Sequence, residues 1–144
     1  MPYEQLLNQR RIQPYNATKT EIKRLLDIAE RDLSTAQSII SKDPDWCYNI
    51  AYNAILQSSR ALMFSIGFRP RGEAQHATVV RFTRETVGQE YVDLVAVFDQ
   101  MRRKRNKVVY EMASLVGSEE AKEALAIARS FVLLMSGLIA GSID

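Results

Sequence analysis

The sequence predicts an all-α fold, a single antiparallel bundle of about five helices. Apolar residues recur at intervals of three and four along most of the 144-residue chain, which is typical of helices with one buried face. No stretch alternates apolar and polar residues as a half-buried strand does. With 47% apolar and 25% charged residues, the composition is that of a globular domain. We expect one domain over residues 1–144, with its core at about 18–140 and an N-terminal extension at 1–17.

Capping residues set the expected helix boundaries. Thr18 and Glu21 have the spacing of a capping box, which marks a helix start. Asp43 followed by Pro44 marks a second start, and Gly67 is a typical residue after a helix end. The predicted helices span about residues 18–40, 44–66, 74–87, 89–112 and 118–139.

Cysteine and histidine content limits the chemistry. The single cysteine, Cys47, allows no intrachain disulfide, which fits a reducing compartment. Cys47 lies on an apolar helix face and is expected to pack as a small hydrophobic side chain. With one histidine, one cysteine and no glycine-rich phosphate loop, we expect no metal ion and no cofactor.

The N-terminus lacks the apolar segment of a signal peptide. The longest apolar stretch, residues 131–140, is shorter than the roughly 20 residues of a membrane-spanning helix. We therefore expect a cytoplasmic protein without a membrane partner.

Arg105 interrupts the apolar face of the fourth predicted helix. The positions that share this face are Leu94, Phe98, Met101, Arg105, Val108 and Met112. Burial of an unpaired guanidinium is costly, and arginine does not lose its proton. Arg105 therefore extends to solvent from the helix edge, pairs internally, or faces a cleft or subunit interface. Arg102, Asn106 and Tyr110 form a polar column beside it at intervals of four.

These residues resemble the signature region of HEPN domains. The family motif is an arginine, then a polar residue that is often asparagine, and then a histidine four to six residues after the arginine. Arg105 and Asn106 match its start, late in the fourth helix. The long second helix, rich in tyrosines and small residues, and His76 after a Gly-Phe-x-Pro linker are also similar to the family. The resemblance covers about residues 18–140.

The resemblance implies a dimeric bundle of four or five helices. Active HEPN domains are metal-independent endoribonucleases in which the arginine and histidine of both protomers meet at the dimer cleft. Many pair with a small nucleotidyltransferase in toxin–antitoxin systems. Others are inactive and serve as RNA-binding or protein-interaction modules.

The sequence departs from the motif at its histidine, because Tyr110 occupies that position. Tyrosine, with a pKa of about 10, is a poor proton carrier at neutral pH. The catalytic-motif positions are thus Arg105, Asn106 and Tyr110, and the expected function is a dimeric RNA-binding or toxin–antitoxin module with a degenerate ribonuclease site. One alternative is a non-catalytic partner of a nucleotidyltransferase. Another is an active metal-independent endoribonuclease that uses Tyr110 or His76 in place of the histidine.

His76, the single histidine, has two interpretations. It is either a residue at a helix start that hydrogen-bonds a neighbour, or an accessory base brought to the cleft.

Phosphate-binding side chains are expected in two basic clusters, although the net charge is only +2. Ordinary surface charge is the alternative interpretation of both. The candidates are Arg102, Arg103, Lys104 and Lys107 in the fourth helix, and Arg69 and Arg71 in the linker after the second.

Overall fold

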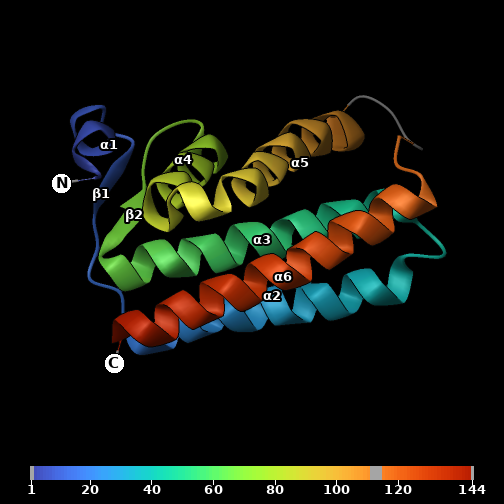
Figure 1. Ribbon diagram of the computed structural model, residues 1–144, viewed down its shortest axis with the longest axis horizontal. Helices are drawn as coiled ribbons and strands as arrows, with labels where there is room; N and C mark the ends of the chain where they lie inside the picture. The colour runs from blue at the N-terminus through green and yellow to red at the C-terminus, as the bar shows by residue number, and fades with distance from the viewer. Residues whose placement is uncertain (1, 111–114, 144) are drawn as a thin grey trace.

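Three long helices form the base of the fold: α2 (Lys19–Ile39), α3 (Pro44–Ile66) and α6 (Ser118–Ile143) (Figure 1). The computed structural model describes residues 2–110 and 115–143, with the side chains of these ranges except at positions 106, 108–110, 142 and 143. Helix α3 packs against both α2 and α6. Helices α2 and α3 run in opposite directions, whereas α3 and α6 lie side by side in the same direction (Figure 1).

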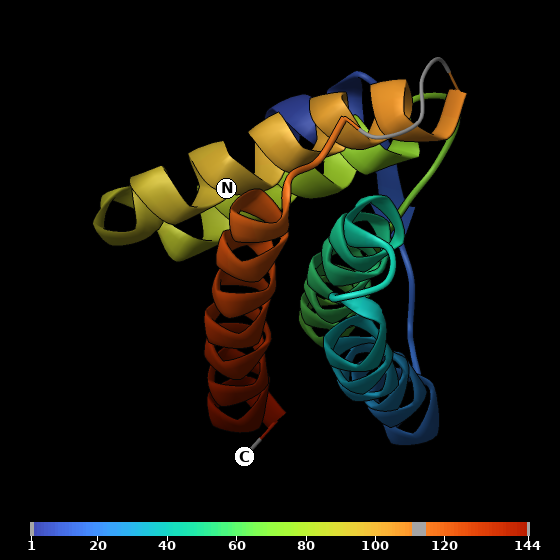
Figure 2. The ribbon, with the colours of Figure 1, turned by 90° about the vertical axis from the view of Figure 1, so that its right-hand side faces the viewer.

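Two further helices lie across one side of this base (Figure 2). They are α4 (Gln75–Val87) and α5 (Val92–Tyr110), joined by η1, a short 3-10 helix (Gln89–Tyr91). Both contact α3 and each other. The fourth predicted helix therefore begins three residues later as an α-helix than the sequence indicated. His76 of α4 and Arg105 of α5 both contact Tyr52 of α3 in this arrangement.

The predicted helix caps are present. The Thr18 hydroxyl accepts a hydrogen bond from the Glu21 amide at 3.1 Å, and the Glu21 carboxylate accepts one from the Thr18 amide at 3.1 Å. The Asp43 carboxylate accepts from the Trp46 amide at 3.1 Å, with Pro44 as the first residue of α3. Gly67 follows α3 with φ of 110°, a left-handed conformation that favours glycine.

A two-stranded antiparallel sheet joins the N-terminal segment to the end of α3, although the sequence indicated no strand. Strand β1 (Ile12–Pro14) pairs with β2 (Phe68–Pro70), and a short helix, α1 (Glu4–Asn8), precedes β1. Leu6 and Ile12 are buried with 0% and 1% of their surface exposed. The described part of the predicted N-terminal extension is therefore packed into the fold, and β2 lies beside α4 (Figure 1).

Helix α6 supplies much of the core and has an apolar outer face as well. Phe131, Val132 and Met135 are buried in the core. By length and composition, Ser118–Gly141 is apolar enough to cross a membrane, a property that core helices share.

Cys47 on α3 is fully buried, and burial raises the pKa of its thiol, as expected for a packing role.

Candidate functional site

Arg105 lies on α5 where this helix crosses α3. It is half-buried, and its guanidinium carbon is 5.8 Å from the centre of the Tyr52 ring. This distance is within the range of a cation–π contact. Arg105 also forms part of a shallow hollow of about 290 Å³, which we call the Arg105 hollow. Its walls are Asp32, Trp46, Asn49, Ile50, Tyr52, Asn53 and Arg105. Arg105 thus lines a cleft, which is one of the arrangements that the sequence left open.

His76 joins this site from the first turn of α4. Its Nδ1 lies 3.0 Å from the hydroxyl of Tyr52, whose side chain is almost completely buried. The ring thus hydrogen-bonds a neighbour, as the first interpretation of His76 predicted. Burial lowers the pKa of His76, and the positive charges of Arg105, Arg102 and Arg60 lower it further. His76 is therefore mainly neutral at pH 7, and the neighbouring arginines disfavour its protonation.

The phenol of Tyr52 stays protonated, because burial raises its pKa far above the ordinary value. Its hydroxyl and His76 Nδ1 therefore share a hydrogen bond in which the tautomer of the ring decides which atom is the donor. Tyr52 thereby fixes the orientation of the imidazole and contacts the guanidinium of Arg105 with its ring.

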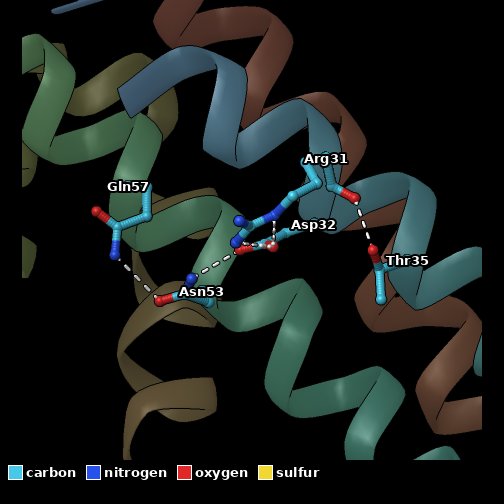
Figure 3. A network of polar contacts seen from close by, with 5 residues as sticks. All are labelled: Arg31, Asp32, Thr35, Asn53 and Gln57. Carbon is cyan, nitrogen blue, oxygen red and sulfur yellow. Dashed lines mark hydrogen bonds and ion pairs between the residues drawn. The ribbon is translucent and has the colours of Figure 1, made fainter. Parts of the chain in front are cut away.

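A chain of polar contacts runs along the outer face of α3 (Figure 3). Asp32 on α2 accepts hydrogen bonds from Arg31 at 2.9 Å and from the Asn53 amide at 2.7 Å. The Gln57 amide donates to Asn53 at 3.1 Å, and Arg60 donates to Gln57 at 2.9 Å. Asp32 is only 5% exposed, so these donors replace the water that its carboxylate would contact at the surface.

Sequence reasoning did not identify this chain of contacts. The sequence nevertheless contains a feature that could have indicated it. Asp32 occupies the same, buried face of α2 as Ala29, Leu33 and Ala36. A carboxylate within an apolar face is the same kind of anomaly as Arg105 in α5.

The basic cluster of α5 is partly neutralised by two acidic neighbours, Asp99 and Glu120. Arg102 and Arg103 both pair with Asp99, at 3.0 and 2.9 Å. Lys104 pairs with Glu120 of α6 at 2.6 Å. These pairs reduce the charge that Arg102, Arg103 and Lys104 offer to a phosphate. Lys107 is exposed in the last turn of α5.

Arg69 and Arg71 lie apart from the Arg105 hollow, at the end of β2. Both are exposed, and both line a second hollow between the sheet, α3 and the start of α4. Asn106 and Tyr110 belong to α5, but their side chains are outside the part of the chain that the structure describes. Among the described residues, no group of three His, Cys, Asp or Glu side chains is placed to hold a metal ion.

Comparison with known protein families gives a match that includes the residues of this site. The family model described as HEPN domain matches residues 22–138, which include α3, α4 and α5 with Tyr52, His76 and Arg105. The comparison with curated proteins gives no match.

Proposed function

Because the chain belongs to the HEPN domain family, we propose that it is a dimeric RNA-binding module whose RNA surface is centred on Arg105. Members of the family are generally ribonucleases, RNA-binding domains or components of toxin–antitoxin systems. The observation that carries the proposal is the half-buried guanidinium of Arg105 in a hollow that opens to solvent. Contact with the Tyr52 ring restricts its orientation, and guanidinium groups bind phosphate with two parallel hydrogen bonds.

The ribonuclease site is degenerate in this proposal, since Tyr110 replaces the motif histidine. Cleavage through the ribose 2′-hydroxyl needs a group that exchanges a proton near neutral pH. One specific observation favours an active enzyme. Neutral His76 lies close enough to Arg105 for the arginine charge to lower the pKa of its ring. An alternative is therefore a metal-independent endoribonuclease with His76 as its base.

RNA binding is tested by fluorescence anisotropy of a labelled single-stranded RNA over a series of salt concentrations. Arg105→Gln should weaken binding by about 1.5–3 kcal/mol, or at least about tenfold, because it removes a charged hydrogen-bond donor. Arg103→Gln is the matched control, since Arg103 is 71% exposed on the same helix and already paired. Equal affinities of the two variants, or no binding by wild type at low salt, would refute the proposal.

Cleavage of the same RNA decides between a degenerate and an active site. A degenerate site predicts no cleavage that depends on Arg105. Cleavage by wild type that is lost in both Arg105→Gln and His76→Gln would establish the enzyme instead.

The dimer and a cytoplasmic location are part of this proposal. Light scattering should give twice the 16.4 kDa of one chain, and a monomer at micromolar concentration would contradict it. The exposed Leu133 and Leu138 on α6 favour a second candidate function, a non-catalytic partner of a nucleotidyltransferase. That function predicts a stable complex with such an enzyme and no RNA binding.

A further inference from the structure

The second hollow, about 420 Å³ in volume, lies where β1 and β2 meet α3 and the first residue of α4. Three guanidinium groups, those of Arg60, Arg69 and Arg71, share its wall, and we call it the arginine hollow. Its lining residues are Gln13, Tyr15, Glu21, Arg60, Phe64, Arg69, Pro70, Arg71 and Gln75. Arg60, which is half-buried on α3, was not among the residues that the sequence singled out.

These three arginines differ in their partners from the basic side chains that form ion pairs. Arg81, Arg102 and Arg103 are paired with carboxylates. Within the part of the chain that the structure describes, no carboxylate lies within ion-pair distance of Arg60, Arg69 or Arg71.

The carboxylate in the wall, Glu21, is already engaged. It accepts hydrogen bonds from the Tyr15 hydroxyl and the Thr18 amide, which together lower its pKa. The wall of the hollow therefore has three positively charged side chains and one negatively charged side chain. The carboxylate of Glu21 accepts its hydrogen bonds from neutral donors.

Neutral groups hold two of the guanidiniums in place. The guanidinium carbon of Arg69 lies 4.7 Å from the centre of the Tyr15 ring. With the Gln13 amide turned so that its oxygen faces Arg69, that oxygen accepts hydrogen bonds from the guanidinium. Arg60 donates to Gln57 at 2.9 Å and lies 5.7 Å from the centre of the Phe64 ring. Such contacts orient the guanidiniums without neutralising them, so less conformational entropy is lost when an anion binds.

The arginine hollow is connected to the Arg105 hollow through one face of α3. Asn53 lines the Arg105 hollow, Arg60 lines the arginine hollow, and Gln57 hydrogen-bonds both. Seven residues of helix separate Asn53 from Arg60, a rise of about 10 Å. One strand of nucleic acid can therefore contact both hollows.

We propose that the arginine hollow is a phosphate-binding pocket, and that it holds a phosphate of an RNA strand that also contacts Arg105. The assignment to RNA rests on the proposed function, whereas the binding of phosphate rests on the hollow itself. Three guanidiniums without carboxylate partners among the described residues line a space large enough for a phosphate, and two of them are held by neutral groups. Guanidinium groups are the donors that this anion prefers.

Two titrations test the proposal with one pair of variants. Arg69→Gln/Arg71→Gln removes two exposed charges from the hollow. Lys122→Gln/Arg129→Gln removes two charges from α6, none of whose described residues lines it. Inorganic phosphate is titrated into isotope-labelled protein and followed by NMR at the amides of Phe68 and Gln75. Saturable shifts are expected in wild type and the control variant, and their loss is expected in Arg69→Gln/Arg71→Gln.

The second titration uses the single-stranded RNA of the anisotropy experiment. Arg69→Gln/Arg71→Gln should reduce the slope of log affinity against log salt by about 0.7, the value for one phosphate contact on a single strand. Absence of saturable phosphate shifts in wild type overturns the pocket. If wild type binds phosphate, but Arg69→Gln/Arg71→Gln has the same RNA affinity and salt slope as the control variant, the assignment of the pocket to RNA is overturned. Failure of the proposed function looks different, because wild type then binds no RNA at low salt.

Discussion

Single side chains around Arg105 are coupled by charge over short distances. His76 has a lowered pKa because it is partly desolvated and because three arginines oppose a positive charge on its ring. Tyr52 connects the two residues by a hydrogen bond to His76 and a ring contact with Arg105. The titration of His76 therefore reports on the charge of Arg105.

Replacement of Arg105 should raise the pKa of His76. Arg105→Gln removes a positive charge that disfavours imidazolium, so the ring protonates at a higher pH than in wild type. NMR titration of the imidazole carbon protons measures this shift directly. Arg103→Gln serves as the control because Arg103 is not among the charges that act on His76. An unchanged pKa in Arg105→Gln would contradict the arrangement of the Arg105 hollow.

Asp32 is expected to contribute to stability because its buried carboxylate accepts a hydrogen bond from the partly buried Asn53 amide. Asp32→Ala leaves the Asn53 amide without its 2.7 Å acceptor, at a cost of about 1–3 kcal/mol in the free energy of unfolding. Urea denaturation gives this quantity. Asp27→Ala is the matched change, since Asp27 is 62% exposed on the same helix and its pair with Lys23 should contribute less than about 1 kcal/mol. Equal effects would argue against the contact chain of Figure 3.

At the scale of the elements, the capping box of α2 links local stability to the arginine hollow. Glu21 closes the box with Thr18 and also accepts from Tyr15, whose ring supports Arg69. The start of α2 therefore helps to position a side chain of a different element.

Loss of the cap should destabilise α2. Thr18→Ala removes the acceptor of the Glu21 amide and is expected to cost about 0.5–2 kcal/mol. The comparison is Thr20→Ala, an exposed position inside the first turn of the same helix. Urea unfolding of both variants measures the difference, and a cost no larger for Thr18→Ala than for Thr20→Ala would refute the role of the cap.

The elements that the sequence predicted are those with a strong local signal. Thr18, Asp43 and Gly67 marked helix ends that the structure confirms, because capping depends on a few adjacent residues. Strands β1 and β2 have three residues each, too few for an alternating pattern to be recognised. Their pairing comes from tertiary contacts between the N-terminal segment and the end of α3.

The same distinction applies to the candidate site. Arg105 was identifiable because a charge in an apolar face is a local anomaly. The contact of His76 with Tyr52, and the convergence of Arg60 with Arg69 and Arg71, join residues from different elements. Such convergence is a property of the folded chain, and no spacing in the sequence encodes it.

On the scale of the whole molecule, stability should depend on pH in two stages. Below about pH 6.5 the unfolded chain binds a proton at His76 that the folded chain resists, because the folded pKa is lowered. The free energy of unfolding therefore falls as pH decreases through this range, by at most about 1.4 kcal/mol per pH unit. The pKa of Glu21 is also lowered, so the free energy of unfolding decreases a second time below about pH 4.3, where the unfolded chain binds a proton at Glu21.

Urea denaturation at a series of pH values measures both stages. His76→Gln should abolish the first stage and keep the second, because His76 is the single histidine of the chain. A variant that retains the full loss between pH 6.5 and pH 5 would show that another group is responsible.

Trp46 places a fluorescent side chain in the wall of the Arg105 hollow. It is the single tryptophan of the chain, 54% exposed, and it forms part of the hollow's wall. Indole emission responds to changes in solvation and to stacking of a neighbouring ring. The molecule therefore carries an intrinsic reporter beside Arg105, and occupancy of this hollow can be followed by unlabelled fluorescence, separately from occupancy of the arginine hollow.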